Sequence, residues 1–302
     1  MDLSICILNW NTAADLRRCL ASLVAAGFSL RAAQPKGCGH EVIVVDNAST
    51  DGSADMVRHE FPQARLIANK NNLGFAAGHN QGIAASSGRY ILLLNADTVV
   101  HANALGTLVA AMDSLPRAAV AGPRLLNADG SLQFSCRRFP RFATGLFRKV
   151  PLGRLLPDNV FNRDYLMASW DHSRERQVDW VSGAAFCLRR EALRDIGLLD
   201  AGYFMYCEDV DWCYRARRAG WQAWYIPQAV ITHLHGRSTD QRPFAMSFQF
   251  HRSMIRFYRK HYSPAWPALL RWLPELCIWL RLAVVLSEHA IQSWRNTLHP
   301  ET

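Results

Sequence analysis

The feature that most constrains this chain is a series of short apolar runs in its first hundred residues, each ending in polar side chains. The runs cover residues 3–8, 41–45, 65–68 and 90–94, and amphipathic, helix-like segments separate them. Alternation of this kind is typical of βα units that build a mainly parallel sheet. The run at 90–94 contains no charged residue, as expected for a strand buried on both faces. We therefore predict an α/β fold in which helices flank a mainly parallel, twisted sheet.

Further local signals complete this prediction. Runs at 180–188, 221–226 and 229–232 predict three more strands, and the sequence NADG at 127–130 predicts a hairpin turn. Thr12 is expected to cap the helix that follows the first run.

The polar residues that follow three of these runs indicate a ligand site. Asn9 follows the first run, Asp46 the second, and Asn95-Ala96-Asp97 the fourth. Ligands of open parallel sheets bind outside the carboxyl ends of the strands, so we expect Asn9, Asp46 and Asp97 to line one crevice. Because carboxylates repel phosphates, a phosphate-bearing ligand would need a divalent cation, Mg²⁺ or Mn²⁺, between itself and these acids.

Composition and motifs narrow the classes of ligand. The net charge of +9 favours an anionic partner, such as a nucleotide, a pyrophosphate or an acidic membrane surface. The chain contains neither G-x-G-x-x-G nor G-x-x-x-x-G-K-[ST], which disfavours a dinucleotide oxidoreductase or a P-loop kinase. No nucleic-acid-binding motif accompanies the positive charge. Eight cysteines without a Cys-x-x-Cys pair, and a start without a basic leader, lead us to expect a cytoplasmic protein.

Three motifs resemble those of glycosyltransferase family 2. They read ILNWN at 7–11, VVDNASTDG at 44–52 and NNLGFAAGHNQG at 71–82, and the resemblance extends over about residues 1–240. Within the family, the sequence is most similar to bacterial rhamnosyltransferases that extend lipid-linked cell-envelope glycans. The resemblance implies a GT-A fold, a nucleoside-diphosphate sugar donor, a divalent cation, and inversion at the anomeric carbon.

The resemblance also implies roles for the residues at the strand ends. Asp46 would hydrogen-bond the pyrimidine base of the donor, with Asn9 and Asn47 beside it. Asp97 would bind metal as the second acid of the family's Asp-x-Asp signature, whose first position here is the amide Asn95, a weaker cation ligand. The other donor-binding positions implied are Asn72, Gly74, Asn80, Trp180 and Gly183.

Two of these positions have a purely structural alternative. Asp46, like Asp51, could form an Asx-turn and cap a helix. Trp180 could stack on a sugar ring or fill the core. Gly183 we expect to permit a close backbone approach.

A second group of acids opens a helix predicted over residues 208–219. An inverting transfer needs a carboxylate that removes the proton of the acceptor hydroxyl, and a helix N-terminus favours its ionised form. The family's Glu-Asp motif matches Glu208-Asp209, and we assign the catalytic base to Asp209 with Glu208 beside it. The structural alternative is that these acids stabilise the helix N-terminus and that Asp211 pairs with Arg215.

Two histidines follow an apolar strand near the expected crevice, in the sequence HLHGRS at 233–238. In the family that the sequence resembles, a histidine at this place can complete the coordination of the metal. We choose His233 as this metal ligand and keep His235 as the alternative.

Residues 241–302 are predicted to form a basic, aromatic helical extension to a domain of residues 1–240, and Pro264, Pro267 and Pro274 are expected to break the extension into pieces. The extension holds eight Arg or Lys and three Glu, a net charge of 8 − 3 = +5, and four tryptophans. Such a helix suits the surface of an anionic membrane, where a polyprenyl-linked acceptor would lie. The alternative is that its tryptophans pack on the domain or on a second subunit. Charges interrupt its most apolar stretch, so we expect it not to cross a bilayer.

Together these features predict an inverting glycosyltransferase that moves a sugar onto a glycan or lipid-linked acceptor, with dTDP-rhamnose as the donor suggested by the family. We expect it at the inner face of the cytoplasmic membrane. Two alternatives remain at this point: a catalytically silent sugar-nucleotide-binding protein, suggested by the amide at position 95, and a nucleotide-sugar hydrolase.

Overall fold

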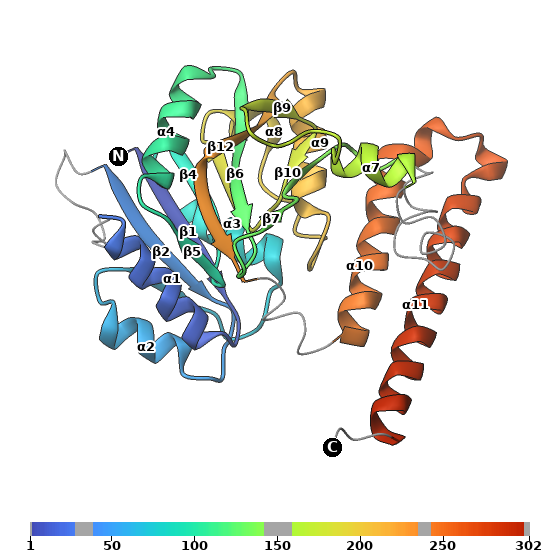
Figure 1. The fold of residues 1–302 in the computed structure, drawn as a ribbon, viewed down its shortest axis with the longest axis horizontal. Coiled ribbons are helices and arrows are strands. Elements are labelled where there is room, and N and C mark those ends of the chain that lie inside the picture. The colour runs from blue at the N-terminus through green and yellow to red at the C-terminus, as the bar shows by residue number, and fades with distance from the viewer. Residues whose placement is uncertain (1, 28–38, 142–158, 235–242, 299–302) are drawn as a thin grey trace.

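The computed structural model describes residues 2–27, 39–141, 159–234 and 243–298, which form a sheet domain and a pair of long helices beside it (Figure 1). The strands are β1 (Leu3–Asn9), β2 (His40–Asp46), β3 (Arg65–Ala68), β4 (Tyr90–Asn95), β5 (Thr98–Val100), β6 (Ala118–Leu126), β7 (Leu132–Gln133), β8 (Cys136–Arg137), β9 (Arg176–Val178), β10 (Trp180–Val181), β11 (Ala185–Arg189) and β12 (Gln222–His233). The α-helices are α1 (Ala13–Ala25), α2 (Ser53–Glu60), α3 (Phe75–Ala85), α4 (Ala104–Ser114), α7 (Val160–Leu166), α8 (Ala192–Ile196), α9 (Glu208–Arg218), α10 (Pro243–Phe257) and α11 (Trp272–Leu298).

The central sheet has ten strands, ordered β3-β2-β1-β4-β11-β6-β12-β5, with β7 and β9 paired at its side. Strands β3, β2, β1 and β4 run parallel, and β11 is antiparallel to both β4 and β6. In the parallel part, Asn9 lies opposite Asp46 and Leu8 lies opposite Asn95. The predicted α/β fold with a mainly parallel sheet is confirmed, and its polar strand ends share one edge.

Residues of the central strands alternate between two hydrophobic cores, one on each face of the sheet. Ile5 and Ile7 of β1 belong to the core that α1, α2 and α4 cover, whereas Cys6 belongs to the core that α3, α8 and α9 cover. Every residue at 90–94 is buried, as predicted for a strand covered on both faces. This double burial fixes the register of β1 and β4 and hence the position of the strand ends.

Two strand predictions differ from the structure. The run at 180–188 forms two strands, because a turn at 182–184 sends β10 to pair with β8 and β11 to pair with β4 and β6. The runs at 221–226 and 229–232 form the single strand β12, whose pairing with β6 shifts register between Ile226 and Val230. Pro227, which has no N–H to donate to the ladder, lies within that shift.

The helical extension consists of α10, a π turn at Tyr258–Tyr262, two short 3₁₀ turns, and α11, which lies beside α10 (Figure 1). Pro264 and Pro267 fall between α10 and α11, as expected for helix breakers. Pro274, predicted to break a helix, instead lies in the first turn of α11, where its missing N–H would have had no partner within the helix. None of the described helices combines the length and the apolarity that a membrane span requires.

Candidate active site

The polar ends of β1 and β2 form one hydrogen-bonded group. The side-chain amide of Asn9 donates to Asp46 Oδ1 over 3.0 Å and to Ser49 Oγ over 3.1 Å. The other oxygen of Asp46 accepts the N–H of Ser49, three residues on, which is a local structural role although an Asx-turn would use the N–H two residues on. Both Asn9 and Asp46 are buried, so the two side chains hold the loop after β2 against the end of β1. Contact of Asp46 with a nucleotide base stays a prediction.

Asp51 has the structural role that its motif allowed. Its Oδ2 accepts the N–H of Ala13 over 2.8 Å, and its Oδ1 accepts the N–H of Ser53. One carboxylate therefore serves the first residues of both α1 and α2. Thr12, which we expected to cap α1 through its side chain, instead donates its hydroxyl to Asn9 Oδ1 over 2.7 Å.

The side chain of Asn47 holds the loop that leads into α3. Its amide nitrogen donates to Asn72 Oδ1 and to the Gly74 carbonyl, and its oxygen accepts from Asn69 and from the N–H of Leu73. All the hydrogen-bonding groups of this side chain are thus satisfied within the protein. Asn47 and Asn72, both predicted to bind the donor, position this loop at the edge of the sheet.

Asn80 fixes a different segment. Its side-chain amide exchanges two hydrogen bonds with the backbone of Leu199, over 2.8 and 3.1 Å. The contact ties α3 to the loop that precedes α9. Donor binding by Asn80 stays a prediction, and the geometry shows a positioning role.

Asn95, Asp97 and His233 meet where β4 and β12 end. His233 Nε2 lies 3.3 Å from Asp97 Oδ1 and 3.3 Å from the amide nitrogen of Asn95. His233 Nδ1 lies 2.8 Å from Gln133 Oε1; because a carbonyl oxygen can only accept, Nδ1 is the donor. With its proton on Nδ1, His233 has a lone pair on Nε2, which can accept from the Asn95 amide and also lies beside Asp97.

This arrangement fits a divalent cation. A carboxylate oxygen and an imidazole lone pair repel each other at this distance unless a proton or a cation lies between them, and both are ligands that divalent metals accept. Gln133 orients the histidine from behind, as outer-shell partners of metal-bound imidazoles do. Among the described residues no three His, Cys, Asp or Glu side chains are placed to hold a metal ion together, so Asp97 and His233 would share the ion with ligand oxygens or water. His235 lies outside the described residues.

The first turn of α9 presents two neighbouring carboxylates, the buried Glu208 and the partly buried Asp209. Asp209 Oδ2 accepts the N–H of Gly183 over 2.9 Å, and this N–H is available because the turn at 182–184 interrupts the sheet. Glu208 is 4% exposed, and among the described residues no donor reaches its Oε2. A buried oxygen without a partner indicates a place that a ligand completes.

The electrostatics of this pair are those of a functional site. Burial raises the pKa of Glu208 well above its ordinary value, and the neighbouring carboxylate of Asp209 raises it further. Burial also raises the pKa of Asp209, although hydrogen bonds from the backbone N–H groups of Gly183 and Val210 oppose that shift. Carboxyl groups with raised pKa values, at the edge where the strands of a sheet end, are typical of proton-transfer sites.

Comparison with known proteins decides the family. A model of "Glycosyl transferase family 2" matches residues 4–197, which include β1, β2 and β4 with their polar ends. The chain belongs to glycosyl transferase family 2.

Individual relatives agree with this assignment. The chain is 31% identical to an N-acetylglucosaminyl-diphospho-decaprenol L-rhamnosyltransferase of Mycobacterium tuberculosis, over 98% of this chain and 96% of that protein. It is 27% identical to the rhamnosyltransferase WbbL of Escherichia coli over 61% of this chain and 70% of that one. A mannosyltransferase from Pyrobaculum calidifontis, solved in complex with GDP-Man and Mn²⁺, superposes with a TM-score of 0.55 at 15% identity, over 99% of this chain and 81% of that one. The fold of this glycosyltransferase is therefore GT-A.

Backbone strain in the glycosyltransferase gathers at the same edge. Asn11 and Ala48, in the loops after β1 and β2, have φ values of 53° and 65°. Tyr206 and Cys207, which precede Glu208, have φ values of 70° and 68°. Residues other than glycine adopt such angles at a cost of about 1–3 kcal/mol each and keep them only where neighbours hold them. No local sequence signal predicted these four positions.

Trp180 lies in the core of the glycosyltransferase. It is 4% exposed, and its indole N–H donates to the Arg138 carbonyl over 2.8 Å. The side chain of Arg137 lies over its ring. These contacts match the packing interpretation of Trp180, and stacking on a sugar stays a prediction.

Sequence reasoning missed three contributors to the site. Gln133 lies in the strand after the predicted hairpin turn, and only the structure places it behind His233. Lys260 and His261, in the extension, reach the acidic start of α9. Their place in a basic tail suggested a membrane surface, and nothing in their spacing indicated a contact with Asp211.

Proposed function

We propose that this glycosyltransferase moves rhamnose from dTDP-rhamnose to a lipid-linked glycan acceptor in cell-envelope polysaccharide synthesis, with inversion at the anomeric carbon. Support for the sugar and the acceptor comes from the mycobacterial relative, whose name states both and which matches nearly the whole chain. The observation on which the proposed chemistry depends is the pair of carboxylates at the start of α9, in which Glu208 is buried and the partly buried Asp209 accepts the N–H of Gly183.

In the proposed mechanism, Asp209 accepts the proton of the acceptor hydroxyl as that oxygen attacks the sugar from the face opposite the phosphate. Two backbone N–H groups orient the carboxylate of Asp209: Gly183 donates to its Oδ2, and Val210, in the first turn of α9, donates to its Oδ1. Asn9, Asp46 and Asn47 shape the loops around the nucleotide. A general base of this kind contributes about 10²- to 10⁴-fold to the rate.

We assign the proposed divalent cation, Mg²⁺ or Mn²⁺, to Asp97 and His233. When bound, the cation would neutralise charge on the leaving nucleoside diphosphate. Asp97 would hold it through a carboxylate oxygen and His233 through Nε2, with Gln133 fixing the imidazole. Support comes from the lone-pair arrangement described above and from the Mn²⁺ with which the related mannosyltransferase was solved.

We place the enzyme at the inner face of the cytoplasmic membrane, with α11 on the lipid side. Exposed apolar side chains lie along one face of α11 at helical spacing: Trp272, Leu276, Trp279, Leu280 and Val284. A lipid-linked acceptor would be presented at such a surface. A dimer formed through the same face is the alternative, and light scattering with and without anionic vesicles separates the two.

The test is the dependence of nucleoside diphosphate release on acceptor. Purified enzyme and Mn²⁺ are incubated with each of a panel of nucleotide sugars, with and without a polyprenyl-diphosphate-linked sugar as acceptor. The released nucleoside diphosphate is quantified, and the mass of the lipid product is measured by mass spectrometry. We expect release only with acceptor, and a product heavier by one deoxyhexose. Equal release without acceptor would identify a hydrolase, and donor binding without release would identify a silent binder.

A further inference from the structure

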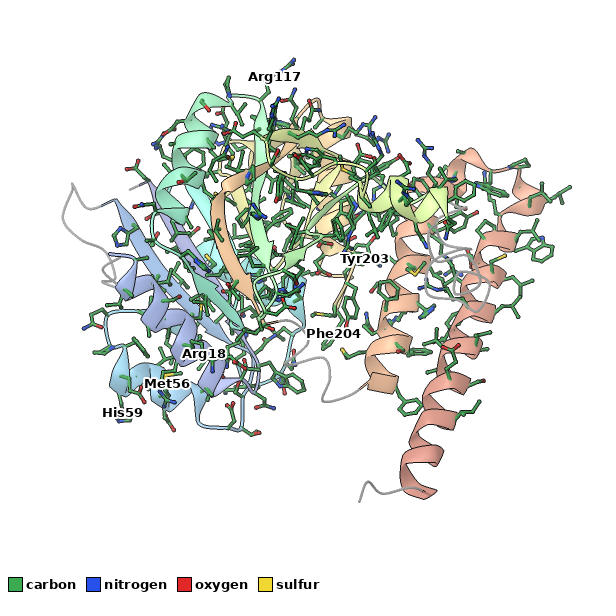
Figure 2. All side chains as sticks on the ribbon, viewed as in Figure 1. Arg18, Met56, His59, Arg117, Tyr203 and Phe204 are labelled. Carbon is green, nitrogen blue, oxygen red and sulfur yellow. The ribbon has the colours of Figure 1, made fainter. Side chains whose placement is uncertain are left out.

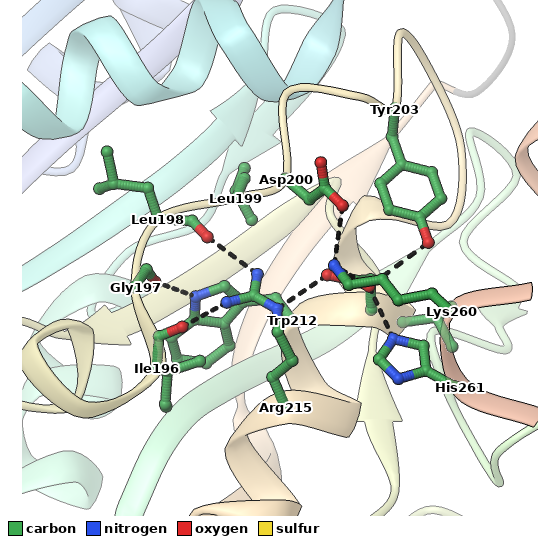
Figure 3. Close-up of polar contacts among 12 residues, drawn as sticks. Ile196, Gly197, Leu198, Leu199, Asp200, Tyr203, Trp212, Arg215, Lys260 and His261 are labelled. Atoms are coloured by element: carbon green, nitrogen blue, oxygen red, sulfur yellow. Dashed lines mark hydrogen bonds and ion pairs between the residues drawn. The ribbon is translucent and has the colours of Figure 1, made fainter. Parts of the chain in front are cut away.

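Lys260 and His261 of the helical extension lie against the start of α9 (Figure 3), where both contact one buried acid, Asp211. Asp211 Oδ1 accepts from His261 Nε2 over 2.7 Å and from Lys260 Nζ over 2.8 Å. Its Oδ2 accepts from Arg215 Nε over 2.8 Å, and the hydroxyl of Tyr203 donates to Oδ1 over 3.3 Å. Burial opposes ionisation of Asp211, but the bonds from His261, Lys260 and Arg215 outweigh it and lower its pKa to about 2.

A second acid, Asp200, joins the same contact. Lys260 Nζ also donates to Asp200 Oδ2 over 2.7 Å, so one ammonium group bridges the loop before α9 and the helix itself. Arg256, one helical turn earlier, donates to both oxygens of Asp200 over 2.9 and 3.0 Å. The two acids and the two cations thus connect α10 and its π turn to residues on either side of Glu208 and Asp209.

The segment between these two acids, residues 200–207, is strained where it enters α9. Tyr206 and Cys207 have the positive φ values described above. The extension contacts this stretch directly: Ser253 Oγ donates to the Met205 carbonyl over 2.8 Å, and the ring of Phe250 packs edge-on against Tyr206. Contacts on this side are therefore in a position to hold a backbone that would otherwise relax.

The other side of residues 200–207 packs against the loop at 69–74 that leads into α3. We call it the donor-site loop, because Asn72 and Gly74 are predicted donor-binding positions. The Phe204 carbonyl accepts the N–H of Phe75 over 2.6 Å, and Gly74 lies so close to Phe204 that a Cβ there would collide with that carbonyl. Tyr203 and Phe204 lie on the side of the sheet domain that faces α10 (Figure 2), and the Arg256 guanidinium lies over the Tyr203 ring. Residues 200–207 are thus held between the donor-site loop and the extension.

We propose that α10 and its π turn are a positioning element of the active site, which holds residues 200–207 and the first turn of α9 so that Asp209 faces the acceptor. Lys260 is the central positioning residue, because it alone among the described residues forms ion pairs with both Asp200 and Asp211. The proposal rests on the proposed function, since it assumes that Asp209 is the base. It makes the extension part of the catalytic machinery in addition to any role at a membrane.

The test replaces Lys260 in the full-length enzyme. We expect Lys260→Met to lower kcat by about 10- to 100-fold, as misplacement of a catalytic group by about 1 Å does, while calorimetry gives an unchanged Kd for nucleoside diphosphate. Lys260→Arg, which keeps a cation within reach of both acids, should restore most of kcat. The melting temperature of each variant is measured alongside.

A matched control comes from the neighbouring residue. Arg259 lies in the same π turn and forms an exposed ion pair with Glu275 over 2.9 Å, away from Asp200 and Asp211. Arg259→Met should leave kcat unchanged. If Lys260→Met proves unstable, Arg256→Met is the second variant. It removes the more exposed ion pair with Asp200, leaves the pair between Lys260 and Asp211 in place, and should lower kcat by a smaller factor. Wild-type kcat in both folded variants overturns this inference alone, whereas a wild-type enzyme without transfer activity overturns the proposed function.

Discussion

The N–H of Gly183 donates to the carboxylate of Asp209 over 2.9 Å, so a break in the sheet and the start of a helix together fix one side chain. The break exists because β10 and β11 pair with different strands. A peptide N–H that would otherwise belong to a ladder thus becomes the orienting donor for the proposed base. Orientation of this kind reduces the reorganisation that proton transfer requires.

The first prediction concerns pH. Because burial raises the pKa of Asp209, we expect the acid limb of kcat/KM to lie above the ordinary aspartate value of 3.8. A general base acts only when ionised, so activity is present above the raised pKa and is lost as pH falls through it. Initial rates measured from about pH 4 to about pH 9 at acceptor concentrations well below KM test this. A limb centred at or below the ordinary value, with the protein still folded, would mean that another group acts as the base.

The second prediction concerns the close approach of Phe204 to Gly74. Gly74 has a φ of 82°, and a Cβ there would collide with the Phe204 carbonyl and lie 2.7 Å from its Cδ2. We expect Gly74→Ala to destabilise the enzyme by about 1–3 kcal/mol through the backbone angles, since ψ is −179° and this region is occupied almost only by glycine, and by about 1–3 kcal/mol more through the collision.

Gly197→Ala is the matched control, because Gly197 has nearly the same backbone angles, with φ 81° and ψ −177°, and a Cβ there would meet no atom closer than Arg215 Nη1 at 3.9 Å. It should show the backbone part alone. Urea unfolding of both variants measures the difference, and equal losses would show that the Phe204 contact is loose.

The third prediction concerns the cation. We expect both Asp97→Asn and Gln133→Leu to weaken the binding of Mn²⁺ in the presence of nucleoside diphosphate. The loss of affinity in Asp97→Asn should be at least as large as the loss in Gln133→Leu. Gln133 only orients His233, and loss of an outer-shell partner weakens metal affinity by about 10- to 100-fold. Calorimetric titration of Mn²⁺ gives both values. Unchanged affinity in both variants would place the cation elsewhere.

Much of the fold could be predicted because local pattern and tertiary structure agree in its first hundred residues. The strand at 65–68 was predicted with its observed bounds, and β1, β2 and β4 each differ by one or two residues. The long run at 180–188 was mispredicted because apolar character cannot reveal which partner each half pairs with. The turn at 182–184 is decided by strands far away in the sequence.

The site could be predicted only in part, for a similar reason. The motifs identified Asp46, Asn47 and Asn72 as candidate site residues. They did not reveal that all the hydrogen bonds of the Asn47 side chain go to the loop of residues 69–74. The contact between Lys260 and Asp211 spans 49 residues and has no local pattern. Long-range polar contacts of this kind depend on how elements pack, which a periodic pattern does not encode.

The most direct measurement compares Asp209→Asn with wild type for turnover and for donor affinity. The amide keeps the shape of the side chain and an oxygen for the Gly183 N–H but cannot accept a proton, so we expect kcat to fall by about 10²- to 10⁴-fold with the donor Kd unchanged. Asp55→Asn, at an exposed acid in the first turn of α2, is the control and should be fully active. Wild-type turnover by Asp209→Asn would contradict the account, because proton removal would then need a different residue.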